Sequence, residues 1–418
     1  MTDPMTDPVA RFEQMAAEHE RCFWLDGGGA RPWSGRRSIL GWLDDNDTSL
    51  VHDATSRTVT RHRDGASEVA GSDIFEVLEA EMAGDDESVH WVGYFGYASR
   101  GDLPARLDPD DPMPTAVWMR TQNVETFIHP EPSPTRAPDS PAPPTAGDEA
   151  VPDDYAAAFA RVQEHLHAGN SYEVNLTYRL GLAHDLDPVR AYLRLRAINP
   201  APYAGFLQHR GNWLLSSSPE RYATIDRHRT IETKPIKGTT PRGETPAQDE
   251  ANRRHLSSDP KFRAENLMIV DLLRNDLAMV CEPGTVEVPV LMDVESYQSV
   301  HQLVSTVRGQ LREEISTIGA LRALFPAGSM TGAPKLRTME IIEEVEQTAR
   351  GAYSGAFGWI SGDGRADLGV VIRSLAGSHE GGWRIGTGGA ITVASEVAEE
   401  HAESRWKAER LLAVRPGH

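Results

Sequence analysis

Carboxylates near the end of the chain form the pattern that most clearly could take part in chemistry. In SEVAEEHAESRWKAERLL, Glu400 and Glu403 are three residues apart, and Lys407 follows four residues after Glu403. On a helix, this spacing places all three on one face. Two carboxylates with a third from elsewhere would suit magnesium, which prefers hard oxygen ligands. A solvated helix with Glu–Lys pairs is the competing interpretation.

Glu265 is the candidate for the third carboxylate. It stands in RAENLMIVDLLRND, beside the apolar run LMIV. An unpaired carboxylate in such surroundings is costly, which makes a metal-binding role more credible for Glu265 than for an average glutamate.

Two segments in the middle of the chain carry a candidate acid and a candidate nucleophile. SSSPERY places Glu220 just after the apolar strand-like run NWLLS, and element ends are common locations for catalytic groups. A simple turn explains that segment equally well. In TKPIKGTTPRG, Lys237 lies between Ile236 and Gly238. Desolvation there would lower the pKa of the lysine and free a neutral amine, although a clamp for a substrate anion or a surface lysine fits as well.

Three further features gain meaning only in combination. Arg373 follows the apolar run LGVVI, so a buried guanidinium there would need a carboxylate partner. His301 has strand-like neighbours in QSVHQLVSTVRG, a setting typical of a core histidine. The glycines of GTGGA would let backbone N–H groups approach an anion closely.

Helices and strands that would position these residues can be read from hydrophobic periodicity. Residues 73–82, 155–168, 188–198, 265–277 and 335–346 have helical spacing. Segments with the pattern of strands lie between these ranges and after the last of them: HWVGYF, SYEVNLTYRLGL, GFLQH, NWLLSSS, GAFGWIS and LGVVIRSLAG. This interleaving without a regular βαβ repeat favours a layered α/β (α+β) fold.

One break in composition divides the chain. Residues 129–152 read HPEPSPTRAPDSPAPPTAGDEAVP, which is rich in Pro and Ala and has no periodicity, so a linker or loop is expected there. It separates an N-terminal region, residues 1–128, from a larger C-terminal region, residues 153–418.

Charge and composition exclude several classes of partner. The chain has 418 residues and a formal net charge of −20, which argues against nucleic acid and anionic membranes as partners. Neither a secretion signal nor a long apolar stretch is evident, so a soluble cytoplasmic protein without a membrane partner is expected. Its two cysteines, Cys22 and Cys281, stand in no CxxC or Cys/His cluster, and two ordinary buried thiols are expected.

The order of the motifs resembles the chorismate-binding enzyme family, which includes anthranilate, aminodeoxychorismate, isochorismate and salicylate synthases. The matching segments are SSSPERY, TKPIKGT, AENLMIVDLLRNDL, SVHQLVSTVRG, LFPAGSMTGAPK, GAYSGAFGWI, VVIRS and GTGGAI…EEHAES. The resemblance covers residues 155–412 closely, and the N-terminal region is similar through SGRRSILG and VGYFGY. It implies one assembly of two β-sheets packed as a sandwich, with helices outside.

The resemblance also implies a metal and a set of substrate contacts. Glu265, Glu400 and Glu403 match the glutamates that bind Mg²⁺, which holds the ring carboxylate of chorismate. Gly388 and Gly389 resemble backbone donors to that carboxylate. The remaining substrate contacts that the resemblance implies are Tyr353 and Arg373 at the enolpyruvyl carboxylate, Lys407 near the metal, and Thr239.

Two matched positions have roles in the chemistry, and one position departs from the family. Glu220 resembles the general acid that helps the C4 hydroxyl leave, and His301 matches an active-site histidine whose role stays open. Three residues before Glu265, some members have a further carboxylate near the metal, where this chain has Phe262. That difference affects only a contact through water.

The second motif indicates which reaction the family resemblance implies. Members that aminate carbon 2 resemble PIAGT, whereas aminodeoxychorismate synthases resemble PIKGT, as here with Lys237. A lysine amine can attack carbon 2, expel the C4 hydroxyl and later be displaced when ammonia adds at carbon 4. Hydroxylating members carry a lysine base in the strand that reads SYEVNLT, and Glu173 stands at that position here.

We therefore expect the large subunit of an aminodeoxychorismate synthase, which forms 4-amino-4-deoxychorismate from chorismate and ammonia. Neither cysteine has the setting of a glutaminase nucleophile, so ammonia would come from the medium or from a separate glutamine amidotransferase subunit. Anthranilate synthase component I is the alternative, although WLDGGG stands where its tryptophan-inhibited members carry Leu-Glu-Ser. A non-catalytic chorismate-binding subunit is the third possibility.

Overall fold

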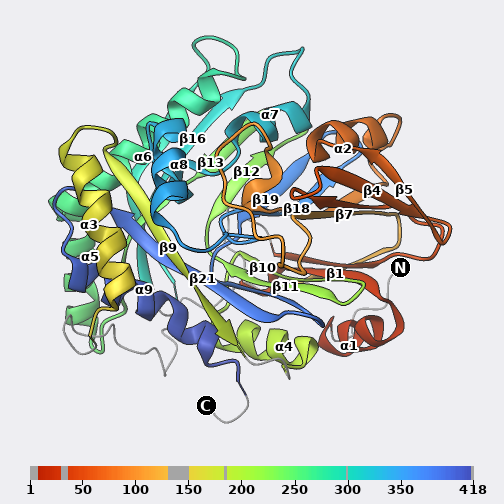
Figure 1. Ribbon diagram of the computed structural model, residues 1–418, viewed down its shortest axis with the longest axis horizontal. Coiled ribbons are helices and arrows are strands. Elements are labelled where there is room, and N and C mark those ends of the chain that lie inside the picture. Colours follow the sequence, from red (N-terminus) through yellow and green to blue (C-terminus); the bar gives the residue numbers. More distant parts are fainter. Residues whose placement is uncertain (1–7, 30–35, 130–149, 183–185, 298–299, 416–418) are drawn as a thin grey trace.

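Two large antiparallel sheets packed face to face form the centre of the molecule (Figure 1). The computed structural model describes residues 8–29, 36–129, 150–182, 186–297 and 300–415. The first sheet has the order β17-β9-β21-β20-β11-β10-β1-β2-β8. These strands are Gly332–Ala333, Glu173–Leu182, Gly382–Ile391, Ser374–Ser378, Asn212–Ser218, Tyr203–His209, Arg21–Asp26, Arg37–Trp42 and Val124–Ile128.

The second sheet has the order β14-β16-β13-β12-β19-β18-β6-β7-β3-β4-β5, and β15 pairs with β16. Its strands are Ile236–Pro241, Val300–Gln310, Thr230–Lys234, Arg221–Ile225, Ala366–Val370, Ala356–Ser361, His90–Phe95, Ala116–Thr121, Ser49–Asp53, Thr58–Arg63 and Ala66–Gly71, with β15 at Glu287–Ser296. Apolar residues of both sheets meet in the sandwich interior, including Phe23 and Leu214 from the first sheet and Tyr94 and Phe357 from the second.

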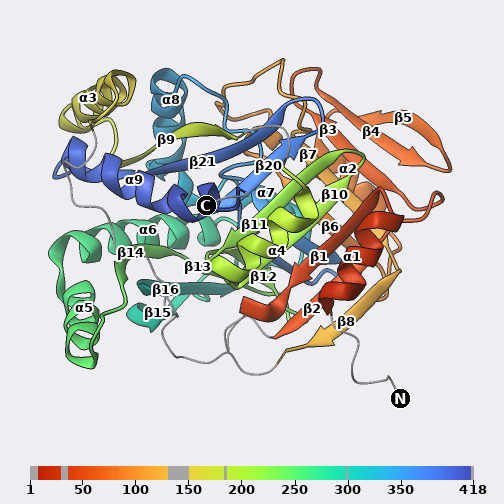
Figure 2. The same cartoon turned by 90° about the horizontal axis from the view of Figure 1, so that it is seen from below.

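Helices cover the outer faces of the sandwich. Seen from below, α1 and α4 lie over the first sheet (Figure 2), where Phe12 and Tyr192 join its outer apolar cluster. Helices α2, α6 and α7 cover the second sheet. The helices are α1 Pro8–Glu18, α2 Ile74–Met82, α3 Asp153–His167, α4 Pro188–Ile198, α5 Pro246–Ser258, α6 Pro260–Ala278, α7 Thr317–Leu324, α8 Lys335–Val345 and α9 Val397–Leu412. This architecture confirms the predicted sandwich with external helices.

The regions on either side of the predicted linker contribute strands to both sheets. In the first sheet β1 pairs with β10, and in the second β6 pairs with β18. Most of the predicted linker, residues 130–149, lies outside the described residues. The chain therefore builds each sheet from both regions.

Two of the points at which the chain crosses between the sheets are adjacent, and both carry predicted site residues. Glu220 lies between β11 of the first sheet and β12 of the second, and Arg373 lies between β19 of the second and β20 of the first. The Ser217 N–H donates to the carbonyl of Arg373 at 3.1 Å, and the Val370 N–H donates to the carbonyl of Glu220 at 3.0 Å. These hydrogen bonds hold the two crossovers side by side.

Candidate active site

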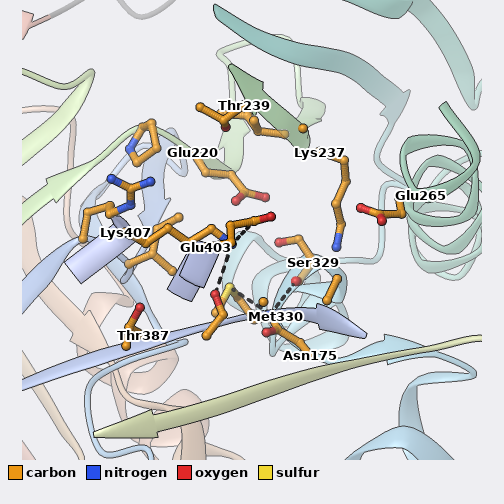
Figure 3. Close-up of a pocket in the computed structure, with 18 of the residues that line it drawn as sticks. Asn175, Glu220, Lys237, Thr239, Glu265, Ser329, Met330, Thr387, Glu403 and Lys407 are labelled. Carbon is orange, nitrogen blue, oxygen red and sulfur yellow. Dashed lines mark hydrogen bonds and ion pairs between the residues drawn. The ribbon is translucent and has the colours of Figure 1, made fainter. Parts of the chain in front are cut away.

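One cavity gathers eleven of the twelve predicted site residues. It lies between the two crossovers, β14, β21, α6 and α9 (Figure 3). The predicted residues that line it are Glu220, Lys237, Thr239, Glu265, Tyr353, Arg373, Gly388, Gly389, Glu400, Glu403 and Lys407. Segments up to 187 residues apart in sequence therefore meet at one place, as the motif resemblance requires.

Lys237 enters the cavity from an irregular part of β14. The register against β16 shifts between Ile236 and Thr239, and such a bulge re-aims a side chain. The next residue, Gly238, has φ of 86°, and a Cβ there would lie 2.9 Å from Leu256 and Phe262 side-chain atoms. Glycine therefore fits this turn better than any residue with a Cβ. In Figure 3 the Lys237 side chain extends between Glu265 and Ser329, across from Glu220.

The charge state of Lys237 differs from the sequence-based expectation. Burial opposes its charge, but Glu173 and Glu265 attract the ammonium, and Glu173 accepts a hydrogen bond from Nζ at 2.5 Å. Together these carboxylates raise the pKa of Lys237. The prediction that desolvation lowers this pKa was therefore wrong, because it did not include a buried carboxylate partner.

Glu220 has the protonation behaviour of a general acid. Its side chain is buried, and desolvation raises its pKa to about 7, although a hydrogen bond from Ser329 and the charge of Lys237 oppose that shift. A carboxyl group with this pKa is partly protonated at neutral pH and can donate a proton there. The sequence could place Glu220 at an element end but could not show its burial.

The three candidate metal ligands come from two helices. Glu265 lies on α6, and its carboxylate accepts no hydrogen bond within the described part of the chain; burial raises its pKa to about 7. Glu400 and Glu403 lie on α9. Glu400 is buried and accepts from Lys261 Nζ at 2.9 Å, and Glu403 pairs with Lys407 at 2.6 Å. The Lys407 charge lowers the pKa of Glu403.

These carboxylates fit a magnesium ion in the manner common for that metal. Among the described residues, no three His, Cys, Asp or Glu side chains stand close enough together to hold an ion by themselves. Mg²⁺ usually binds through one or two carboxylates, several waters and the substrate. The hard oxygen donors around the cavity, with the buried Glu265 carboxylate free of hydrogen bonds, suit that mode.

The opposite side of the cavity suits an anion. Arg373 is partly buried, and it makes no ion pair with a carboxylate among the described residues. The predicted carboxylate partner is thus not found. Desolvation lowers the pKa of Arg373 to about 10, so the guanidinium stays charged at neutral pH. Beside it, the ring of Tyr353 stacks against the Arg179 guanidinium at 4.8 Å.

The glycines of β21 serve two purposes. A Cβ on Gly386 would lie 2.1 Å from the Tyr353 ring, so this position needs a glycine. β20 pairs with β21 only as far as Ile385. Beyond Ile385, β21 pairs only with β9 in the described structure, so its other edge is open. Lys407 Nζ donates to the Gly388 carbonyl at 3.1 Å on the open edge. The N–H and C=O groups of one residue in an antiparallel strand point to the same edge, so the Gly388 N–H also faces the cavity side. Successive residues point to opposite edges, so the Gly389 N–H points toward β9.

His301 is the one predicted site residue that does not line the cavity. It lies on β16, where its ring contacts Asp249 Oδ1 at 3.0 Å and the Ser296 hydroxyl at 2.8 Å. Its neighbour Gln302 lines the cavity instead. Desolvation lowers the pKa of His301, so the ring is mainly neutral at neutral pH.

Several lining residues were not anticipated from the sequence. Lys261 pairs with Glu400, and its position four residues before Glu265 on a helical pattern was the signal available for it. Ser329 belongs to the motif LFPAGSMTGAPK but had no role assigned. Asn175 and Thr387 also line the cavity, one on β9 and one on β21. No local pattern marks either of these.

Similarity to known proteins places the chain in the class of chorismate binding enzymes. A family model described as chorismate binding enzyme matches residues 20–413, and the chain belongs to that family. Solved structures agree on the fold. Anthranilate synthase component I from Streptococcus pneumoniae TIGR4 superposes with a TM-score of 0.75 at 23% identity, over 91% of this chain and 93% of that one. For the menaquinone-specific isochorismate synthase from Escherichia coli the TM-score is 0.67 at 17% identity, over 99% and 93%.

Several curated relatives are named aminodeoxychorismate synthase, and one from Haloarcula marismortui, 41% identical over 62% of this chain and 52% of that protein, is named anthranilate synthase component 1 3. The chain is 37% identical over 98% of its length to an aminodeoxychorismate synthase from Streptomyces pristinaespiralis, and 38% identical over 98% to one from Streptomyces griseus. It spans 63% and 62% of those proteins, which is less than two thirds of their length. It is also 43% identical to aminodeoxychorismate synthase component 1 from Escherichia coli (strain K12), over 62% of this chain and 56% of that protein. The sequence-based assignment to the family is confirmed.

None of the helices in the described part of the chain is both long enough and apolar enough to cross a membrane.

Proposed function

We propose that this chain aminates carbon 4 of chorismate, as the large subunit of an aminodeoxychorismate synthase. The observation that carries the proposal is the position of Lys237, whose amine lies in the cavity beside Glu265 and across from Glu220. An alanine there, as in the family's carbon-2 aminases, could supply no nucleophile. The names of the relatives at 37% and 38% identity support the same activity.

In this proposal the substrate is held by its two carboxylates. Arg373 and Tyr353 bind the enolpyruvyl carboxylate, and the Gly388 N–H donates to the ring carboxylate. Thr239 and Lys407 line the same cavity as further substrate contacts. Glu265, Glu400 and Glu403 would hold a magnesium ion, which supplies charge neutralisation for the ring carboxylate when it is bound.

The chemistry then depends on Lys237 and Glu220. Lys237 first gives up a proton, and its amine then bonds to carbon 2 while the ring double bonds shift and the bond between carbon 4 and its hydroxyl breaks. Glu220 donates the proton that lets the hydroxyl leave as water. Ammonia next bonds to carbon 4, and the bond between carbon 2 and Lys237 breaks to free the lysine.

Ammonia has to come from outside this chain. Cys22 and Cys281 are buried free thiols, and burial raises the pKa of Cys22 to about 12 and that of Cys281 to about 11. Neither is a thiolate at neutral pH, so neither can act as a glutaminase nucleophile. We propose a separate glutamine amidotransferase subunit as the partner, in line with the relatives named component 1.

The product identifies the function directly. With chorismate, Mg²⁺ and ammonium, the purified chain is expected to form 4-amino-4-deoxychorismate, which mass spectrometry and NMR distinguish from the 2-amino isomer. With glutamine in place of ammonium, no product is expected until a glutaminase subunit is added. Formation of anthranilate or of the 2-amino isomer would establish the anthranilate synthase alternative. Unchanged chorismate under all conditions would indicate a non-catalytic binding subunit.

The raised pKa of Glu220 predicts how the activity depends on pH. The acid must be protonated to act, so kcat/KM for chorismate should fall as the pH rises through about 7. Saturating Mg²⁺ keeps Glu265 ionised across this range, so that the decline reports Glu220. Glu220→Gln should lower kcat by roughly 10²–10⁴-fold and remove the decline. If kcat/KM of the Gln variant still declines near pH 7 as in the parent, another group donates the proton.

A further inference from the structure

Lys237 is paired with a carboxylate that the substrate cannot reach. Its Nζ donates to Oε1 of Glu173 at 2.5 Å, and the Glu173 side chain is fully buried. Glu173 begins β9, where its backbone pairs with Ala333 of β17, and it is not among the residues that line the cavity. It therefore contacts the lysine from behind the cavity wall.

The second carboxylate oxygen of Glu173 has no hydrogen-bond donor in the described structure. Oε2 is buried and has no hydrogen-bond partner in the described structure, so Lys237 is the one group that stabilises this carboxylate by a direct contact. A buried charge of this kind is costly unless it is fully paired. In the resting site the carboxylates keep Lys237 charged by raising its pKa. Transfer of the lysine proton to Glu173 would leave both groups of the pair neutral.

Other charged groups around Lys237 have different partners or different roles. Glu220, from the crossover after β11, has to deliver a proton to the leaving hydroxyl. On α6, Lys261 pairs with Glu400, and Glu265 faces the proposed metal site. On α9, Lys407 is held by Glu403. Glu173 is the carboxylate in direct hydrogen-bond contact with the lysine amine.

We propose that Glu173 accepts the proton of the Lys237 ammonium and so releases the amine to attack carbon 2. An N–H bond of Lys237 breaks, its proton moves to Glu173, and the freed electron pair forms the bond to carbon 2. The electron pair of the breaking bond at carbon 4 leaves on the hydroxyl oxygen, which takes a proton from Glu220 and departs as water. When ammonia has bonded to carbon 4, the pair of the carbon 2–nitrogen bond returns to Nζ, and Glu173 gives its proton back. This inference rests on the proposed function and makes Glu173 a positioning residue that acts through Lys237.

The test is the rate of covalent adduct formation, measured from the mass of the quenched protein with chorismate and Mg²⁺ present and ammonia withheld. Glu173→Gln keeps the shape of the side chain but cannot take a proton. At neutral pH its adduct should form about 10²-fold more slowly than in the parent, and the rate should rise with pH as solvent replaces the missing acceptor. Glu173→Asp, which keeps an acceptor, should retain the parental pH profile.

Asp276→Asn is the matched control, because Asp276 is a buried carboxylate that pairs with Lys335 at 2.7 Å outside the cavity. It should leave the pH profile of adduct formation unchanged. A Gln variant that forms adduct at the parental rate or faster, that is slowed equally at every pH, or that no longer binds chorismate would overturn the role of Glu173. Absence of any adduct on Lys237 in the parent would instead overturn the nucleophilic role that the proposed function gives to Lys237, and this inference with it.

Discussion

Lys237→Ala is expected to abolish the covalent adduct and to lower the rate of 4-amino product formation by at least about 10³-fold. The lysine is held beside the ring, whereas free ammonia has to reach it from solution, and a positioned nucleophile has an effective concentration far above any ammonium buffer. Without the lysine on carbon 2, ammonia can attack that carbon directly. The remaining product should therefore shift toward the 2-amino isomer.

The measurement combines product analysis with peptide mapping. In the parent without ammonia, the mass increase should map to the peptide that contains TKPIKGT. Lys234→Ala is the matched control, because Lys234 stands in the same segment but pairs with Glu295 at 3.0 Å and does not line the cavity. It should keep both the adduct and the 4-amino product.

A simpler role for Lys237 makes a different prediction. If the lysine only binds a substrate carboxylate, Lys237→Ala weakens chorismate binding, yet every remaining product molecule still carries nitrogen at carbon 4. Parental rate and product in the variant, with no adduct in the parent, would rule out the nucleophile. The two roles thus differ in the position of the nitrogen as well as in the rate.

Local sequence signals predicted α2, α3, α4, α8 and most of α6, whereas α1, α5 and α7 were not expected. The helical spacing of residues 155–168 corresponds to α3, and that of residues 188–198 matches α4. Asp73, at the start of the expected helix, caps α2 by accepting from the Phe75 and Glu76 N–H groups. Each of these features lies within a few residues of the element that it specifies.

Strand pairing could not be predicted in the same way. β1 pairs with β10 and β6 with β18, across the predicted linker and far apart in sequence. Alternating apolar residues specify that a strand is half-buried, but they carry no information about which strand lies beside it. The sandwich itself came from the family resemblance rather than from periodicity.

In the site, the sequence predicted which residues are present but not the surroundings of each. Motif order placed eleven predicted residues in one cavity, yet the environment of several of them differed from expectation. The partner of Lys237 lies 64 residues earlier, on a strand of the other sheet, so its raised pKa had no local signal. Arg373 lacks the expected carboxylate, because it faces a cavity that suits an anion from the substrate.

Replacement of the candidate metal ligands should also strongly reduce activity. Glu265→Gln is expected to weaken Mg²⁺ binding at least about 10-fold and to abolish turnover at low magnesium, with the fold intact. Replacing a residue that only supports a metal ligand costs about 10–100-fold in affinity, so replacing a ligand should cost at least as much. A neutral amide also holds a divalent cation poorly. Glu403→Gln should act in the same direction, because its carboxylate lines the same cavity.

Calorimetric titration of Mg²⁺ in the presence of chorismate measures this loss independently of catalysis. Asp276→Asn is again the suitable control, since Asp276 lies on the same helix as Glu265 but is already neutralised by Lys335. It should bind Mg²⁺ as the parent does. If both glutamate variants turn over at nearly the parental rate at low magnesium, these carboxylates do not hold the metal. In that case Lys261 with Glu400 and Lys407 with Glu403 would form a structural ion-pair network on this side of the cavity.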